Sequence, residues 1–133
     1  MPQIVLAKSA GFCFGVNRAV NMVEELVKEG KKVCTLGPII HNEQVVNDLK
    51  SKGVRIAQTP IDRQGDDEVM VIRSHGVTKA VEDEINQGGK SVNATCPYVT
   101  NIHKIVEKAS AKGDTILIAG DKEHPEVVGI SGR

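Results

Sequence analysis

Two of the three cysteines lie where a short apolar run passes into a loop that opens a helix. Cys13 stands in Ala10-Gly11-Phe12-Cys13-Phe14-Gly15, and Cys96 stands in Asn93-Ala94-Thr95-Cys96-Pro97. The positive end of a helix favours a negatively charged sulfur, so both thiols are candidate metal ligands. No C-x-x-C pair supports this assignment, and burial as a small residue is the alternative. Cys34 lies within the predicted strand 33–36 and is expected in the core.

Three histidines also follow predicted strands. His41, His75 and His124 occupy loops after apolar runs, whereas His103 falls in a predicted helix and is expected at its surface. Imidazoles beside free backbone N–H groups and helix N-termini suit an anionic group such as phosphate. Each histidine alone could instead cap a helix or complete a turn, but three together favour a binding role.

One carboxylate stands close to these histidines in the sequence. Glu126 follows His124 by two residues, with a proline between them. We single it out as a candidate proton donor or base, and capping of the next helix is the alternative. The acidic run Asp66-Asp67-Glu68 is interpreted as a solvated loop.

The elements that must position these residues alternate regularly. Continuous apolar runs, typical of buried parallel strands, alternate with segments whose apolar residues recur every three or four positions, as on a helix face. This order predicts an α/β fold of repeated strand-loop-helix units with a parallel sheet. Ligands of such folds gather outside the carboxyl ends of the strands, where the cysteines and histidines fall. We predict strands at 4–7, 33–36, 54–57, 69–72, 91–94 and 115–119, and helix boundaries at Gly53, Thr78 and Pro97.

The composition excludes several classes of protein. The 133-residue chain carries 17 Lys and Arg against 17 Asp and Glu, so it lacks the positive charge that a nucleic-acid binder needs. No apolar stretch is long enough for a membrane span, and the first residues lack the basic and apolar regions of a signal peptide. We therefore expect a cytoplasmic protein with no membrane contact. An odd number of cysteines in such a protein indicates thiol or metal chemistry, or simple burial, more than disulfides.

The segments around these residues closely resemble, in the same order, the motifs of the 4-hydroxy-3-methylbut-2-enyl diphosphate reductase family. The resemblance covers nearly the whole chain. Members of this family reductively remove the allylic hydroxyl of their substrate and yield isopentenyl and dimethylallyl diphosphates, the last step of the non-mevalonate isoprenoid pathway. The matching segments are Ala10-Gly11-Phe12-Cys13-Phe14-Gly15-Val16, Leu36-Gly37-Pro38-Ile39-Ile40-His41-Asn42, Ile72-Arg73-Ser74-His75-Gly76-Val77, Asn93-Ala94-Thr95-Cys96-Pro97 and His124-Pro125-Glu126-Val127-Val128-Gly129.

The resemblance implies a [4Fe-4S] cluster, for which Cys13 and Cys96 match two of three cysteine ligands. It implies that His41, His75 and His124 bind the diphosphate and that Glu126 delivers protons, with electrons supplied by ferredoxin or flavodoxin. Family members are longer and have three α/β lobes, and their third cysteine lies beyond the residues that match here. The resemblance thus implies a first lobe at 1–96 and the beginning of a second at 97–133, with little activity expected from this portion alone.

Two other functions stay open on the residues alone. The chain could be a non-catalytic phosphate-binding module that uses the three histidines without a metal. A zinc hydrolase with mixed cysteine and histidine ligands is less well supported, because H-E-x-x-H and closely spaced ligands are absent. Under the first-lobe interpretation, apolar lobe faces would be exposed and would favour self-association.

Overall fold

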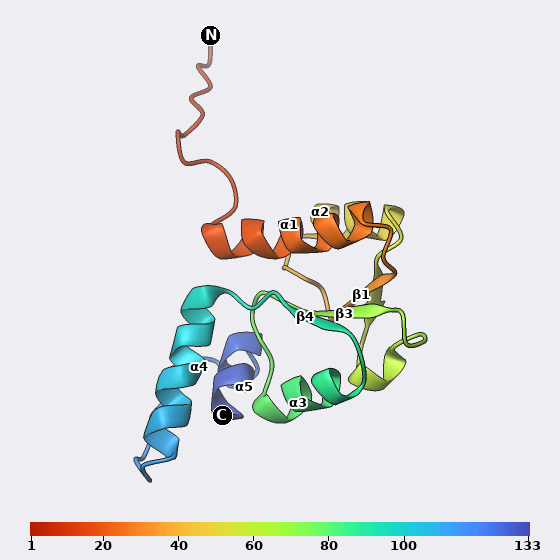
Figure 1. Ribbon diagram of the computed structural model, residues 1–133. Helices are drawn as coiled ribbons and strands as arrows, with labels where there is room; N and C mark the ends of the chain where they lie inside the picture. Colours follow the sequence, from red (N-terminus) through yellow and green to blue (C-terminus); the bar gives the residue numbers. More distant parts are fainter.

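The computed structural model describes residues 1–133, and its centre is a four-stranded parallel sheet with the strand order β2-β1-β3-β4 (Figure 1). All three strand pairings are parallel, so each connection must cross over the sheet. The predicted α/β class with a parallel sheet is confirmed. The strands are β1 (Val33–Leu36), β2 (Arg55–Ala57), β3 (Val69–Ile72) and β4 (Ser91–Asn93).

The helices cover both faces of this sheet. Helices α1 (Phe14–Lys28) and α2 (Glu43–Ser51) lie over one face, and α3 (Lys79–Gln87) lies under the other (Figure 1). Helices α4 (Pro97–Ser110) and α5 (Pro125–Ser131) lie side by side next to the sheet. None of these helices combines the length and hydropathy that a membrane span requires.

The two central strands, β1 and β3, have continuous apolar sequences with no alternation of polar and apolar residues. Both are buried along their full length, because side chains on each face meet helices. Val33, Val69 and Val71 pack in a cluster with apolar residues of α1 and α2. On the opposite face, Cys34 and Met70 pack in a second cluster with Ile85 of α3. Cys34 is thus a core residue, as predicted.

The predicted helix boundaries are confirmed. The Thr78 hydroxyl accepts a hydrogen bond from the Val81 backbone N–H at 3.3 Å and caps α3. Pro97 occupies the first turn of α4. Gly53 follows the end of α2 with φ +90°, a conformation that glycine adopts without steric cost.

The strands predicted at 4–7 and 115–119 are wrong for this chain. Neither segment forms a strand, and neither pairs with the sheet. An extended segment becomes a strand only when a neighbour binds its backbone N–H and C=O groups, and hydrophobic pattern alone supplies no neighbour. The first residues accordingly run outward from α1 (Figure 1).

The acidic run at 66–68 is also only partly solvated. Asp66 and Asp67 are exposed, but Glu68 is buried at the start of β3. Its carboxylate accepts hydrogen bonds from Arg55 Nε and Nη2, both at 2.9 Å. A buried carboxylate is tolerated where a cation neutralises it, and Arg55 lies on β2, 13 positions earlier in the chain.

Candidate functional site

Three histidine rings lie in a row at the carboxyl edge of the sheet. His41 follows β1, His75 follows β3, and their ring centroids are 4.5 Å apart. His124 precedes α5, and its ring centroid is 6.2 Å from that of His75. His41 and His124 are exposed, whereas His75 is half-buried between them. The loops therefore bring together the three histidines that the sequence singled out.

Hydrogen bonds between the loops hold this edge together. The backbone N–H and hydroxyl of Ser74 both donate to the Ile39 carbonyl, at 3.3 and 3.0 Å. The Cys96 N–H donates to the Ser74 carbonyl at 2.9 Å. The loops that carry His41, His75 and Cys96 are thus bonded to one another through Ser74.

The electrostatic surroundings of His75 favour its neutral form. Burial, with smaller contributions from the charges of His41, Arg73 and His124, lowers the pKa of His75 to about 4. Its Nδ1 atom is buried and has no hydrogen-bond partner. A neutral imidazole still donates one N–H, so His75 can bind an anion without carrying a charge of its own.

Arg73 adds a positive charge that sequence reasoning did not single out. Burial lowers the pKa of Arg73, and its Nε atom has no partner. Its guanidinium packs over Gly37, where a Cβ atom would lie 2.7 Å from Nη1. A buried and incompletely satisfied guanidinium two residues before His75 attracts an anion to this edge. The sequence could have pointed to Arg73, because a charged side chain directly after a buried apolar strand lies at the edge where ligands bind.

The two candidate thiols begin two helices. Cys13 is the N-cap residue of α1 and Cys96 is that of α4, and neither side chain caps its own helix. Gly15 lies so close to Cys96 that a Cβ atom there would be 2.5 Å from Sγ. The Cys96 sulfur therefore lies against the first turn of the helix that Cys13 opens. Arg18, further along α1, donates to the Thr95 carbonyl at 3.2 Å and ties the two segments together.

A metal site is not complete within the chain. No three His, Cys, Asp or Glu side chains come together in a geometry that would hold a metal ion. Cys34 does not supply a third thiolate, because burial raises its pKa to about 12 and its side chain faces the core. The chain therefore offers two thiols at adjoining helix N-termini, where the helix dipoles favour an anionic ligand.

Glu126 lies in the first turn of α5, beside His124. Its backbone N–H donates to the Nδ1 atom of His124 at 3.2 Å, so neutral His124 carries its proton on Nε2. The Glu126 side chain makes no capping hydrogen bond, because the His124 side chain caps α5. Glu126 nevertheless lies in the first turn of α5, where a carboxylate interacts favourably with the helix dipole, so the capping alternative stays open beside a role in proton transfer.

Other polar groups near the site serve the fold. The Asn42 side chain accepts from the Val45 N–H at 3.0 Å and caps α2.

Beside Asn42, a cavity of about 630 Å³ opens along α2, with space for part of a small ligand. Its lining comprises Pro38, Ile40, His41, Asn42, Glu43, Val46, Asn47 and Lys50.

The expectation that His103 lies at the surface of its helix is wrong. Its side chain is buried on α4, with 4% of the residue exposed. The helical pattern treats histidine as polar, but His103 stands one turn after buried Val99, on the same face. Glycines from two other segments make room for its ring, and their effect is not visible along the helix itself.

The fold and this edge define an α/β protein that gathers three histidines at the ends of parallel strands and holds two free thiols at the N-termini of α1 and α4. Residues 4–133 match the family model described as LytB protein, and the chain belongs to that family. It is 50% identical over 133 residues to the 4-hydroxy-3-methylbut-2-enyl diphosphate reductase of Clostridium perfringens (strain 13 / Type A), covering 98% of this chain and 47% of the relative. The reductase of Aquifex aeolicus (strain VF5) is 46% identical, with 99% of this chain and 46% of the relative covered.

Two solved structures share the fold. One is described as (E)-4-hydroxy-3-methyl-but-2-enyl diphosphate reductase, the terminal enzyme of the non-mevalonate pathway, and matches with a TM-score of 0.83 and 45% identity. It covers 97% of this chain and 46% of the solved chain. The reductase from Plasmodium falciparum has a TM-score of 0.87 and 28% identity, covering 94% and 40%. The chain thus spans about half the length of the curated relatives it matches.

Proposed function

We propose that this chain forms the N-terminal part of an iron–sulfur reductase that converts 4-hydroxy-3-methylbut-2-enyl diphosphate to isopentenyl and dimethylallyl diphosphates. The observation that carries the proposal is the row of His41, His75 and His124, with centroid separations of 4.5 and 6.2 Å. Such a row provides several N–H donors over the span of a diphosphate. The names of the relatives support the same substrate.

In this proposal the three histidines bind and orient the diphosphate. His75 donates an N–H from a neutral ring, and Arg73 behind it adds a positive charge. Glu126, on the turn that His124 caps, delivers one proton to the departing hydroxyl, which leaves as water, and after it is reprotonated a second to the allyl fragment, while the reduction takes up two electrons. These roles are separate, so binding and turnover should respond to different substitutions.

The cysteines fit part of the site of a [4Fe-4S] cluster. Cys13 and Cys96 would supply two thiolates at the N-termini of α1 and α4, and the close contact with Gly15 places Cys96 against the first turn of α1. A bound cluster would supply electrons for the reduction, received from ferredoxin or flavodoxin. The third thiolate would come from outside these residues.

The proposal also divides the chain. Residues 1–96 would form the first lobe, since all four strands lie within that range. Residues 97–133 would begin the second lobe, and its two helices lie against each other beside the sheet (Figure 1).

A direct experiment joins this chain to the part of the C. perfringens reductase that lies beyond the aligned half. We expect the fusion to bind a cluster and to reduce the substrate with a chemical electron donor. Glu126→Gln should depress turnover far more than substrate binding, because it removes a proton and leaves the histidines in place. Equal losses of both would assign Glu126 to binding instead.

A non-catalytic phosphate-binding module is the alternative that the histidine row also favours. Anaerobic reconstitution of the unfused chain with iron and sulfide separates the two. A cluster that is lost in Cys13→Ser and in Cys96→Ser supports the reductase. An inactive fusion without a cluster, in a folded protein that binds pyrophosphate, supports the module.

A further inference from the structure

The His103 ring fills a slot between two glycines that come from different segments. A Cβ atom at Gly76 would lie 2.8 Å from His103 Cε1, closer than real contacts allow. A Cβ atom at Gly129 would lie 3.4 Å from His103 Nε2. Both glycines therefore leave space that the imidazole occupies.

These glycines lie on the two segments that carry His75 and His124. Gly76 directly follows His75 and has φ +76°, so it shapes the turn that carries that ring. Gly129 lies on α5, one turn after Glu126. His103 thus contacts, from behind, the segment that bears His75 and the helix that His124 caps.

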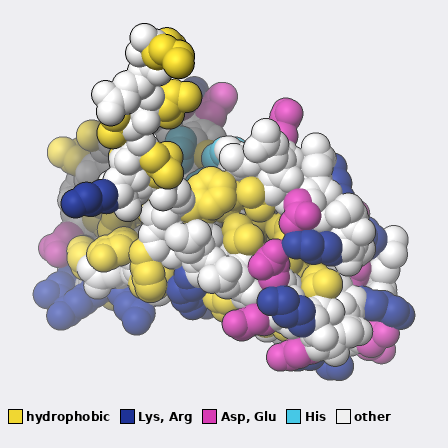
Figure 2. Space-filling view, turned by 90° about the horizontal axis from the view of Figure 1, so that it is seen from above, with side chains coloured by type: hydrophobic (Ala, Val, Ile, Leu, Met, Phe, Trp, Pro, Cys, Tyr) yellow, Lys and Arg dark blue, Asp and Glu magenta, His cyan; other side chains and the backbone are white.

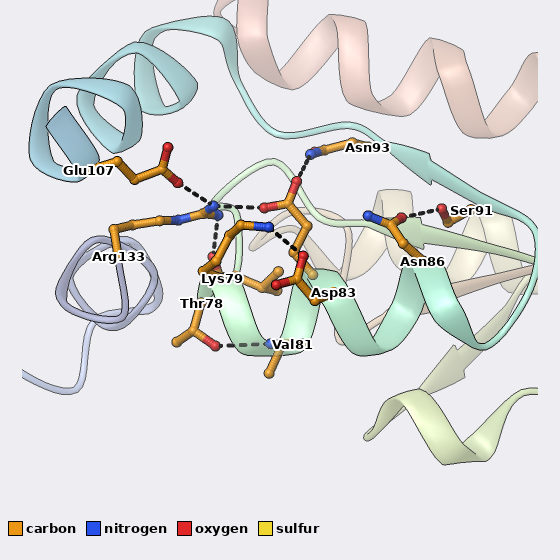
Figure 3. A network of polar contacts seen from close by, with 11 residues as sticks. Thr78, Lys79, Val81, Asp83, Asn86, Ser91, Asn93, Glu107 and Arg133 are labelled. Carbon is orange, nitrogen blue, oxygen red and sulfur yellow. Dashed lines mark hydrogen bonds and ion pairs between the residues drawn. The ribbon is translucent and has the colours of Figure 1, made fainter. Parts of the chain in front are cut away.

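The neighbouring ion pairs fix α5 against the same structure. Arg133 Nη1 lies 2.7 Å from a Glu82 oxygen on α3 and 3.1 Å from a Glu107 oxygen on α4 (Figure 3). Its Nη2 atom donates to the Val77 carbonyl at 2.8 Å. The Lys79 N–H donates to the Gly132 carbonyl at 3.2 Å. These contacts hold the end of α5 against α3 and α4, the helix that carries His103.

The ring acts through its shape more than through its polar atoms. Its Nε2 atom is buried and has no hydrogen-bond partner. Burial, aided by the charge of Arg133, lowers the pKa of His103, while Glu82 and Glu107 oppose the shift. The neutral ring therefore fills the space that Gly76 and Gly129 leave, with no polar partner at Nε2.

We propose that His103 is a positioning residue that sets the separation between His75 and the His124–Glu126 turn. The inference rests on the proposed function for the identity of the ligand, a diphosphate. The geometric part of the inference is independent of the proposed function, because the spacing of the rings is a property of the chain itself.

The test uses the 133-residue chain with inorganic pyrophosphate as the probe. The chain has four histidines, so proton–nitrogen NMR resolves every ring, and single substitutions assign each signal. His103→Ala removes the ring. Val99→Ala is the matched control, because Val99 is also buried on α4, one turn earlier, and its truncation also leaves a cavity.

We expect His103→Ala to shift the ring signals of His75 and His124 and to weaken pyrophosphate binding by about tenfold, since loose support of a binding group lowers affinity. Val99→Ala should lose thermal stability while it keeps the wild-type ring signals and affinity. If His103→Ala does not fold, His103→Gln, which keeps the length but not the flat ring, should show the same changes to a smaller degree.

Two results would overturn the inference. One is that His103→Ala, or His103→Gln in its place, leaves the His75 and His124 signals unchanged. The other is that Val99→Ala shifts those signals equally. Failure of the wild-type chain to bind pyrophosphate would instead contradict the proposed function, and the ring signals of the variants would still decide the role of His103.

Discussion

The Cys96 sulfur lies against Gly15, at a distance where a Cβ atom would approach Sγ to 2.5 Å. Gly15 is in the first turn of α1, two residues after its N-cap residue Cys13. The two cysteines are far apart in the sequence, and one glycine without a side chain allows the second to reach the helix of the first. Any residue larger than glycine must displace the Cys96 loop or the helix.

Gly15→Ala should therefore destabilise the chain. A Gly→Ala change within a helix normally stabilises by about 1 kcal/mol through helix propensity. Here overpacking against Cys96 should cost about 1–3 kcal/mol, which exceeds that gain and leaves a net loss of up to about 2 kcal/mol. The measurement is urea denaturation, with Asn21→Ala at an exposed position of α1 as the control. If Gly15→Ala is as stable as Asn21→Ala, the close contact is not present in solution.

The three thiols should differ in their reaction with a thiol reagent. Cys13 is exposed, Cys96 is half-buried, and Cys34 is buried with a pKa raised to about 12, chiefly by burial. Because the thiolate is the reactive form, Cys34 should stay unmodified until the chain unfolds. Mass spectrometry of the native chain after timed labelling should find Cys13 modified first. Labelling of Cys34 at the rate of Cys13 would mean that β1 opens readily.

His75 should make stability depend on pH. Its pKa is lowered to about 4 from the ordinary value of 6.5, so the unfolded chain binds more protons than the folded chain between these values. As far as His75 is concerned, the free energy of unfolding should then be highest above about pH 6.5 and should decrease as the pH drops toward about 4. His75→Asn should flatten this fall, and urea denaturation across that range measures it. A variant with the wild-type slope would show that His75 is protonated in the folded chain.

The same slope should persist in part after that substitution, because burial also lowers the pKa of His103. The difference between the wild-type and His75→Asn curves isolates His75 from His103. His41→Asn should also flatten the fall to a small extent, because the charge of His41 contributes to the lowered pKa of His75.

Much of the sheet could be predicted from the sequence, because the strand positions depend on local pattern. The apolar runs 33–36 and 69–72 became β1 and β3, each buried on both faces. The runs at 4–7 and 115–119 have a similar pattern, yet no neighbouring strand binds their backbone in this chain. Pairing is a property of two segments, so a pattern read along one segment cannot decide it.

The sequence predicted that the histidines would lie near one another, but it did not predict which other side chains position them. The parallel-sheet rule predicts that His41 and His75 meet at one edge. It says nothing of Arg73 and His103, whose places depend on Gly37 and on the pair Gly76 and Gly129. When glycines elsewhere in the chain make room for a side chain, the sequence around that side chain does not predict its position.

Arg55 should be important for stability, although it lies on a short edge strand. Its Nε and Nη2 atoms both donate to the buried Glu68 carboxylate, and this interaction is the main cause of the lowered pKa of Glu68. Arg55→Ala should cost about 2–3 kcal/mol near neutral pH, because it leaves a buried carboxylate without its cation. Lys52→Ala, which removes only exposed ion pairs, should cost no more than about 0.5 kcal/mol.

The deficit of Arg55→Ala should shrink as the pH falls, because Glu68 without its cation can take up a proton and lose the unfavourable charge. The double variant Arg55→Ala/Glu68→Gln should be more stable than Arg55→Ala for the same reason. A double variant that is less stable would show that Glu68 contributes through its other hydrogen bond, to the Gln64 N–H at 2.6 Å.

Finally, the chain should associate with itself through its unpaired apolar segments. Ile4, Val5 and Leu6 are 95, 81 and 82% exposed on the outward N-terminal segment, and Figure 2 shows apolar side chains gathered along it and over the surface below. Extended apolar backbone without a partner can pair with the edge of another sheet. Val5→Lys should reduce the association, whereas Ile61→Lys, at an exposed apolar residue of the short helix 60–62, should not. Light scattering after size-exclusion chromatography measures the mass. A monomer at every concentration would mean that these segments do not find partners in a second copy.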